Sequence, residues 1–342
     1  MNSIERIKSA VNFETPDRVP VIAQVFGHAA TLANVPLGEY VRNGELIARC
    51  QIKALEHYGY DAVFALMDVN VETEAVGSVL TYRPDLYPIV KSYVLSKVAN
   101  LDSLSVPDPH EAGRMPELLK AVRILRRELG DNVLVVGCVL GPMTQATQLL
   151  GIESALYLAI DEPESFARIL DFSTEIIVRF GVAQIEAGAH LPIVFDPSAS
   201  PAVVPHQFFR EFELPRLQRV FSSFRQAEAV ANWLHIAGPT DPVLPFYPDA
   251  GVEIANFDYC VDPLEAQQVL PRSCLDGNIK SLSFVEATPE EVAVESSRLL
   301  DLFADRGGFI LSSGCEIPPE SNPENVAAMV LATRGRRLFC CP

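Results

Sequence analysis

Eight short apolar segments recur along the chain, and a longer amphipathic stretch separates each from the next. The segments lie at residues 19–25, 61–68, 133–140, 191–195, 231–236, 252–257, 273–279 and 309–313. Apolar runs without polar alternation are typical of strands that are covered on both faces, as in parallel sheets. Strand and helix that alternate eight times in 342 residues predict one closed (β/α)8 barrel of the TIM type, which spans residues 1–342 as a single domain.

The stretches between the predicted strands have the period of amphipathic helices. The clearest are residues 46–58, 116–129, 164–187, 205–227 and 289–306. Several begin with helix-start residues, such as Thr288-Pro289 and Asn322-Pro323. An open, doubly wound sheet is the structural alternative, which we disfavour because no GxGxxG motif follows the first strand.

Residues 79–93 depart from this pattern. They alternate in polarity, and Pro84 and Pro88 interrupt them. Proline is confined to edge strands and turns because it cannot donate a backbone hydrogen bond. The segment therefore predicts a β-hairpin or an irregular insertion after the second strand.

The charge balance is strongly acidic, since 44 Asp and Glu residues oppose 27 Lys and Arg residues and give a net charge of −17. A negative field repels phosphate backbones and anionic lipid, so we expect neither nucleic acid nor a membrane as partner. The apolar segments are far shorter than the roughly 20 residues of a membrane helix, and the polar start is unlike a signal peptide. The seven cysteines, which include Cys340 and Cys341, are odd in number and irregularly spaced. They predict reduced thiols in a cytoplasmic protein.

The second apolar segment runs directly into Asp68, Asn70, Glu72 and Glu74. These residues share strand parity, so they would face the same way if the chain stayed extended. Active sites of β/α barrels lie where the strands end. We therefore interpret the set as polar groups of a pocket, with Asn70 and Glu72 as candidate substrate-binding residues. A solvated strand end is the alternative.

Other strand ends also carry polar residues. Asp196 and Asp258 follow the fourth and sixth strands, Asn278 lies at the end of the seventh, and His28 follows the first. Each aspartate can serve either as a turn or helix cap or as a hydrogen-bond acceptor in the pocket. We include all four as candidate substrate-binding residues.

Two further strand ends carry potential metal ligands. His235 ends the fifth strand, and Cys315 follows the eighth. A His and a Cys on separate strand ends make half of a tetrahedral zinc site. A lone His or Cys more often has a structural role, so these residues leave metal binding open.

Several motifs together carry a resemblance to a known family. They are residues 5–21, residues 68–77 (DVNVETEAVG), Gly141-Pro142-Met143-Thr144, His235-Ile236-Ala237-Gly238, Gly277-Asn278-Ile279 and residues 314–325. With these motifs the chain resembles the uroporphyrinogen decarboxylase superfamily over essentially its whole length. The barrel fold of that superfamily agrees with the eight predicted strands.

The resemblance to the true decarboxylase is the weaker one. That enzyme carries an arginine-rich loop after the first strand, which grips the many carboxylates of its substrate. The corresponding loop here, residues 24–31, contains no arginine, although an octa-anion needs guanidinium groups to hold it. Asp68 does match the catalytic aspartate of the decarboxylase, so this activity remains as an alternative.

The chain is more similar to the branch of the superfamily that moves methyl groups from corrinoid proteins, such as the methylcobamide:coenzyme M methyltransferases. That branch has the Asp-x-x-Val-Glu-x-Glu-Ala-x-Gly pattern seen at residues 68–77. The resemblance implies a methylcobalamin-type corrinoid carried by a partner protein, together with a small-molecule methyl acceptor. We take Asp68 and His235 as catalytic residues and keep a homodimer as an open expectation.

Members of this branch bind zinc through a His-x-Cys pair after the fifth strand and a Cys after the eighth. His235 and Cys315 match two of these ligands, but Ala237 stands where the middle Cys should be. The zinc of that branch binds and deprotonates a thiol acceptor. A tight site here needs another ligand, for which Glu316 is the candidate, so we predict weak zinc binding or none.

An acceptor that is already nucleophilic at neutral pH needs no metal, and the N5 atom of tetrahydrofolate is such an acceptor. The edge of a pterin presents donors and acceptors that Asp68, Asn70, Asp196 and Asn278 can pair with. We therefore expect a methyltransferase of one-carbon metabolism that uses tetrahydrofolate rather than a thiol. A uroporphyrinogen decarboxylase and a non-catalytic corrinoid- or porphyrin-binding protein are the alternatives.

Overall fold

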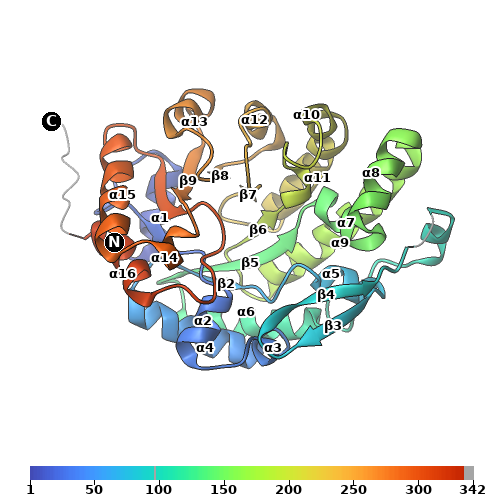
Figure 1. Ribbon diagram of the computed structural model, residues 1–342, viewed down its shortest axis with the longest axis horizontal. Coiled ribbons are helices and arrows are strands. Elements are labelled where there is room, and N and C mark those ends of the chain that lie inside the picture. Colours follow the sequence, from blue (N-terminus) through green and yellow to red (C-terminus); the bar gives the residue numbers. More distant parts are fainter. Residues whose placement is uncertain (96–97, 335–342) are drawn as a thin grey trace.

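Eight parallel strands form the central sheet, in the order β1-β10-β9-β8-β7-β6-β5-β2 (Figure 1). The computed structural model describes residues 1–95 and 98–334. The strands of the sheet are β1 (Val21–Ile22), β2 (Ala62–Ala65), β5 (Leu134–Leu140), β6 (Leu191–Phe195), β7 (Trp233–His235), β8 (Ile254–Asn256), β9 (Cys274–Ile279) and β10 (Phe309–Ser313). Each strand lies within one of the eight apolar segments, so the predicted TIM-type barrel is confirmed.

Helices surround the sheet and connect successive strands (Figure 1). They are α1 (Ser3–Val11), α2 (Gly27–Ala33), α3 (Leu37–Tyr40), α4 (Gly44–Tyr58), α5 (Val71–Val76), η1 (Val98–Ser103), α6 (Met115–Leu129), α7 (Pro142–Leu150), α8 (Ile152–Asp161), α9 (Pro163–Glu186), η2 (Pro197–Ala199), α10 (His206–Phe208), η3 (Phe209–Glu213), α11 (Leu214–Gln226), η4 (Leu244–Phe246), α12 (Tyr247–Ala250), α13 (Pro263–Val269), α14 (Ser283–Glu286), α15 (Pro289–Leu302) and α16 (Pro323–Ala332). In the part of the chain that the structure describes, none of these helices is both long and apolar enough to cross a bilayer.

The stretch 205–227, which the sequence predicts as one helix, is divided in the structure. A π-helical turn, η3, separates the short α10 from α11. Pro215 lies in the first turn of α11 and has no N–H to continue a regular ladder from the preceding turn. A π turn accommodates such an interruption without breaking the helix axis.

The strands are buried on both faces, as their composition predicts. Every residue of β2, β5 and β6 is buried. Inside the barrel the rings of Phe64 and Trp233 pack with centroids 6.1 Å apart. Beside them Asp276 accepts hydrogen bonds from Trp233 Nε1 (3.2 Å) and Asn256 Nδ2 (3.0 Å). Both donors are neutral side chains. Burial raises the pKa of Asp276 to about 7, although these hydrogen bonds favour the ionised form.

The insertion after β2 is a β-hairpin, which confirms one of the two forms that the sequence left open. Strands β3 (Val79–Arg83) and β4 (Leu86–Ser92) pair antiparallel in a sheet of their own. The hairpin lies against α3 at the lower right in Figure 1, where Gly38 N donates to Pro84 O (2.7 Å). Strand β4 also reaches the mouth of the barrel, as described below.

Side chains close the seam between β1 and β2, the two ends of the strand order. Asp61, at the start of β2, donates its backbone N–H to Val21 O (2.8 Å), and its Oδ2 accepts from Val21 N (2.8 Å). Further along the seam, Gln51 of α4 donates to Val25 O (2.8 Å) and accepts from Phe64 N (3.3 Å). The barrel is therefore completed by two buried side chains in place of a strand ladder.

Two arginines neutralise the buried Asp61 carboxylate. Arg6 Nη1 lies 2.6 Å from Oδ1, and Arg18 Nη1 lies 2.8 Å from Oδ2. Ser3 Oγ of α1 also donates to Oδ1 (2.9 Å). The cluster ties α1 and the start of β1 to β2 at the amino-terminal end of the barrel.

The described cysteines are free thiols, as expected for reduced cysteines. They are Cys50, Cys138, Cys260, Cys274 and Cys315. Cys340 and Cys341 lie outside the described residues.

Asp61→Ala is expected to lower the free energy of unfolding by about 3–5 kcal/mol, because it removes the buried carboxylate that Arg6 and Arg18 share and opens the seam. Urea denaturation followed by circular dichroism measures the change. Asp161→Ala, at an exposed carboxylate that ends α8, is the matched control and should stay within about 0.5 kcal/mol of wild type. Equal midpoints for Asp61→Ala and wild type would show that the seam needs no carboxylate.

Candidate active site

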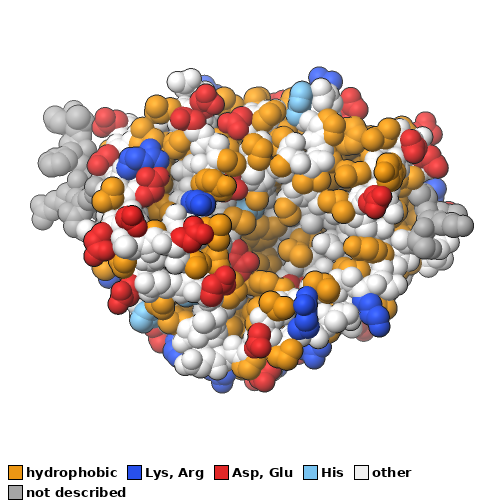
Figure 2. Space-filling view, in the orientation of Figure 1, with side chains coloured by type: hydrophobic (Ala, Val, Ile, Leu, Met, Phe, Trp, Pro, Cys, Tyr) orange, Lys and Arg blue, Asp and Glu red, His pale blue; other side chains and the backbone are white. Residues whose placement is uncertain are grey.

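A cavity of about 190 Å³ opens at the carboxyl ends of the barrel strands. Figure 2 shows a hollow near the centre of this face with hydrophobic side chains around it. The lining residues are Phe26, Leu66, Met67, Asp68, Val69, Val71, Glu72, Tyr87, Leu118, Cys138, Val139, Leu140, Phe180, Phe195, Pro197, His235, Ala237, Cys315 and Glu316. Three of them are carboxyl residues, and none of the described lining residues is Lys or Arg. The cavity is thus an apolar chamber with acidic groups in its wall.

Asp68 lines the cavity and is held by Arg114, which precedes α6. Arg114 Nη1 and Nη2 donate to the two carboxylate oxygens (2.5 and 3.2 Å). Nε of the same arginine donates to Glu74 Oε2 (2.5 Å), and Tyr82 of β3 donates to Glu74 Oε1 (2.5 Å). Burial alone would lower the pKa of Arg114, but the carboxylates of Asp68 and Glu74 outweigh it and raise the pKa above its ordinary value. Asp68 therefore faces the cavity as one member of a fixed ion-pair network.

The chain after Asp68 does not stay extended, so the expectation that four polar residues share one strand face is wrong. Helix α5 begins at Val71 and turns Glu72 and Glu74 in different directions. Asn70 is placed outside the cavity, where its Nδ2 donates to Pro88 O of the hairpin (2.7 Å). Its backbone N–H donates to Asp68 Oδ1 (2.9 Å). Asn70 thus joins the hairpin to the strand end.

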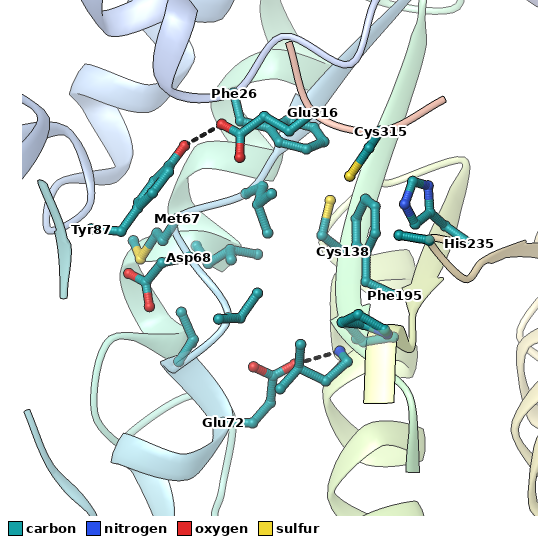
Figure 3. Close-up of a pocket in the computed structure, with 18 of the residues that line it drawn as sticks. Phe26, Met67, Asp68, Glu72, Tyr87, Cys138, Phe195, His235, Cys315 and Glu316 are labelled. Atoms are coloured by element: carbon teal, nitrogen blue, oxygen red, sulfur yellow. Dashed lines mark hydrogen bonds between the residues drawn. The ribbon is translucent and has the colours of Figure 1, made fainter. Parts of the chain in front are cut away.

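Glu72 points from α5 into the cavity, at the opposite side from Cys315 (Figure 3). Its Oε1 accepts a hydrogen bond from Leu140 N at the end of β5 (2.9 Å). Burial raises the pKa of Glu72 to about 7, although this hydrogen bond favours the ionised form. At neutral pH the carboxyl can hold or release a proton.

Glu316 lies at the other side of the cavity, beside Tyr87 of the hairpin. The Tyr87 hydroxyl donates to Glu316 Oε1 (2.5 Å), as Figure 3 shows, and Gly27 N lies 3.3 Å from the same oxygen. Burial raises the pKa of Glu316 to about 7, and the hydrogen bond from Tyr87 opposes the rise. The hairpin therefore contributes directly to the wall of the cavity.

His235, Cys315 and Cys138 lie close to one another, on the side of the cavity opposite Asp68 and Tyr87 (Figure 3). Burial lowers the pKa of His235 to about 3 and raises that of Cys315 to about 11, so the imidazole and the thiol are both neutral. His235 Nδ1 is buried and has no hydrogen-bond partner among the described atoms. Burial also raises the pKa of Cys138 far above its ordinary value.

These residues do not fit a zinc ion held by three protein ligands. Glu316, the third ligand that the sequence suggested, turns its carboxylate toward Tyr87 and away from Cys315 (Figure 3). Ala237 offers no donor atom. Within residues 1–95 and 98–334, no group of three His, Cys, Asp or Glu side chains is placed to hold a metal ion. The prediction of Glu316 as a metal ligand is therefore corrected.

Asp196 lies outside the cavity and has the capping role that the sequence left as an alternative. Its carboxylate accepts from Thr144 N (2.7 Å), Thr144 Oγ1 (2.6 Å) and Met143 N (3.3 Å). These groups belong to the first turn of α7, whose N–H groups have no partner within the helix. Asp196 therefore fixes α7 to the end of β6.

The other three predicted binding residues are also absent from the lining of the cavity. Asp258 Oδ2 accepts from Gly238 N (2.8 Å), and Asn278 Nδ2 donates to Asp258 O (3.2 Å). His28 is buried between Tyr58, whose hydroxyl lies 2.7 Å from Nε2, and Pro319 O, 3.2 Å from Nδ1. All three side chains hold loops together instead of facing a ligand.

Sequence reasoning missed three residues of the site. Tyr87 lies in the hairpin, Cys138 lies inside the third apolar segment, and Arg114 precedes a helix, so none occupies a recognised strand end. A signal for Arg114 existed in principle, because a buried aspartate requires a cation. The sequence does not say which of its 27 Lys and Arg residues supplies it.

Glu72→Gln is expected to flatten the pH dependence of stability. The pKa of Glu72 lies above its ordinary value of 4.5, at about 7, so the native state binds more protons than the unfolded state between these values. The free energy of unfolding therefore falls as pH rises from about 4.5 to 7, by at most roughly 3 kcal/mol for this group. Urea denaturation at pH 5 and pH 8 should show a smaller fall in Glu72→Gln. The exposed Glu290→Gln should keep the wild-type fall, and identical falls in all three proteins would contradict the assignment.

Ala237→Cys is expected to create stoichiometric zinc binding, because a second thiolate would join His235 and Cys315. Wild type should lose its zinc on dialysis against a mild chelator, whereas the variant should keep about one ion per chain. Elemental analysis after dialysis measures both. Ala237→Ser is the matched control and should behave as wild type; chelator-resistant zinc in wild type would overturn the expectation.

Comparison with known proteins identifies the family of the chain. The family model for uroporphyrinogen decarboxylase (URO-D) matches residues 2–336. The methylcobamide:CoM methyltransferase MtaA of Methanosarcina barkeri is 30% identical over 336 residues, which are 96% of each chain. A uroporphyrinogen decarboxylase of Syntrophotalea carbinolica is 28% identical over 85% of this chain and 84% of its own.

A solved structure described as a methyltransferase from Methanosarcina mazei has the same barrel, with a TM-score of 0.89 at 29% identity. The match covers 97% of this chain and 98% of that chain. The likeness thus includes the strand ends that build the cavity and is not limited to one motif. The chain is an enzyme of the uroporphyrinogen decarboxylase family.

Proposed function

We propose that the protein moves a methyl group between a corrinoid carried by a partner protein and a small molecule bound in the cavity. Support comes from the similarity to the methylcobamide:CoM methyltransferase over almost the full length of both chains. The cavity opens at the end of the barrel where such enzymes bind their substrates. A corrinoid presented by a partner would approach from this face.

The observation that carries the proposal is the charge of the cavity wall. Uroporphyrinogen bears many carboxylates, and an anion of that kind needs Arg or Lys donors. The described lining residues offer Asp68, Glu72 and Glu316 and no basic side chain. A cavity of about 190 Å³ would enclose only part of a tetrapyrrole, since about 150 Å³ holds one benzene molecule. These facts favour methyl transfer over the decarboxylase alternative.

The residues of the chain act on the bound small molecule. Phe26, Phe195 and Met67 exclude water, while the Arg114 pair keeps Asp68 in one orientation toward the cavity. The corrinoid supplies an electrophilic methyl group when methylated, and the small molecule supplies the lone pair that accepts it. Glu72 can take up a proton that the acceptor releases, because its carboxyl is unpaired by any described cation and lies in the cavity wall.

The acceptor expected from the sequence, tetrahydrofolate, depends on four hydrogen-bonding residues. Only Asp68 of the four lines the cavity, while Asn70, Asp196 and Asn278 bond to backbone groups elsewhere. The geometry therefore gives the folate no particular support. An anionic thiol also lacks a basic partner. The cavity favours a small acceptor without negative charge.

Methyl transfer is tested with methylcobalamin and a set of acceptors that includes tetrahydrofolate, an anionic thiol and small neutral nucleophiles. Wild type is expected to convert methylcobalamin to the reduced corrinoid, followed by its absorption spectrum, and fastest with the neutral acceptors. Phe195→Ala should slow the reaction, because it admits water and loosens the bound molecule. Tyr157→Ala, at an exposed ring on α8, is the control.

Uroporphyrinogen should remain unchanged with the same preparations. Anaerobic incubation followed by chromatography of the porphyrins measures its consumption. Formation of coproporphyrinogen at an enzymatic rate, without conversion of methylcobalamin, would reverse the assignment.

A further inference from the structure

Two carboxyl groups of the cavity have no counter-ion. Asp68 is paired with Arg114, but neither Glu72 nor Glu316 has an ion-pair partner in the described part of the chain. Glu72 is 2% exposed. Buried carboxyl groups are normally paired with a cation, because burial of an unpaired charge is costly. The described lining of the cavity therefore offers two carboxyl groups that a bound cation could ionise and pair with, and no Lys or Arg.

Aromatic rings line the same cavity as these two carboxyl groups. The rings of Phe26 and Phe195 meet edge to face with centroids 5.8 Å apart, and the Phe195 centroid lies 4.9 Å from that of His235. Figure 3 shows Glu316 beside Phe26, Phe195 beside Cys138 and His235, and Glu72 at the opposite end of the cavity from Glu316. The buried Nδ1 of His235 is unpartnered in the same wall. Cations are attracted to aromatic faces within about 6 Å of the ring centroid.

We infer that the small molecule of this cavity is a methylated onium ion, a sulfonium or quaternary ammonium, whose demethylated form is the neutral thioether or tertiary amine. The inference rests on the proposed function and names its substrate class. A primary ammonium would need several direct hydrogen bonds, which apolar walls do not provide. An onium ion spreads its positive charge over its methyl groups. It can therefore contact aromatic rings directly while carboxylates in the same cavity balance its charge.

The size of the cavity agrees with this class. Its volume of about 190 Å³ exceeds the roughly 150 Å³ that accommodates benzene. Trimethylsulfonium and tetramethylammonium each contain fewer non-hydrogen atoms than benzene and fit within this volume. A longer substituent can extend from the mouth of the barrel.

The reaction of an onium ion balances without a proton. The bond from sulfur or nitrogen to the methyl carbon breaks, and its electron pair stays on the heteroatom. The reduced corrinoid of the partner, Co(I), supplies the pair for the new cobalt–carbon bond and becomes Co(III). In reverse, the lone pair of the thioether or tertiary amine takes the methyl group. No thiol must be deprotonated, which agrees with a site whose residues do not fit a three-ligand zinc ion.

Binding is tested by calorimetry on the whole protein without corrinoid. Tetramethylammonium and trimethylsulfonium should bind at least about tenfold more tightly than tert-butanol, their neutral analogue. Glu72→Gln and Phe195→Leu should each weaken the cations about tenfold and leave tert-butanol unchanged. The exposed Glu290→Gln is the matched control, and thermal unfolding shows that each variant is folded. Equal binding of cation and alcohol, or unchanged binding by Glu72→Gln, would overturn the inference.

Methyl transfer separates this inference from the proposed function. Wild type with cob(I)alamin should form methylcobalamin from at least one of the two onium ions. If the cations bind but only methylcobalamin and a thiol or folate react, the substrate class is wrong and the methyltransferase stands. If the cations bind as expected and no acceptor or donor exchanges a methyl group with cobalamin or with a corrinoid protein, the proposed function fails, and the onium substrate fails with it.

Discussion

The barrel depends on one buried carboxylate, that of Asp61. The strand order ends at β1 and β2, so closure needs bonds that the ladder does not supply. Asp61 supplies them through its backbone and side chain to Val21, and Arg6 and Arg18 keep its charge neutralised. The cavity at the opposite end is built from strand ends that keep their positions only when the barrel is closed. The closure of the barrel at its amino-terminal end therefore determines the positions of the residues that line the cavity at the carboxyl ends of the strands.

The sequence predicted the strands well because parallel strands in a barrel are buried on both faces and leave an uninterrupted apolar run. It also located the hairpin from its two prolines. It failed where local chemistry has two physical solutions. Residues 68–74 fit both a strand face and a helix start, and Asp196 fits both a ligand contact and a helix cap. Only the position of the neighbouring backbone N–H groups, such as that of Thr144, decides between them.

The same limit explains the residues that were missed. Arg114 and Tyr87 act on Asp68 and Glu316 across 46 and 229 positions of sequence, and no local pattern records such a pairing. The resemblance implies a cysteine where Ala237 stands, but the sequence does not show how the neighbouring side chains are arranged. Glu316, which the sequence suggested as a further ligand, accepts a hydrogen bond from Tyr87 instead of facing His235 and Cys315. Among the described residues Glu316 therefore does not complete a three-ligand set with His235 and Cys315.

The hairpin forms part of the cavity wall, but its strands do not pair with the strands of the barrel. Strands β3 and β4 pair only with one another, yet Tyr87 bonds to Glu316 and the Pro88 carbonyl accepts from Asn70. Mutations in this insertion can reshape one side of the chamber while the eight-stranded ladder and the Asp61 seam stay intact. The shape of the chamber and the closure of the barrel therefore rest on different hydrogen bonds, and the first can change while the second is kept.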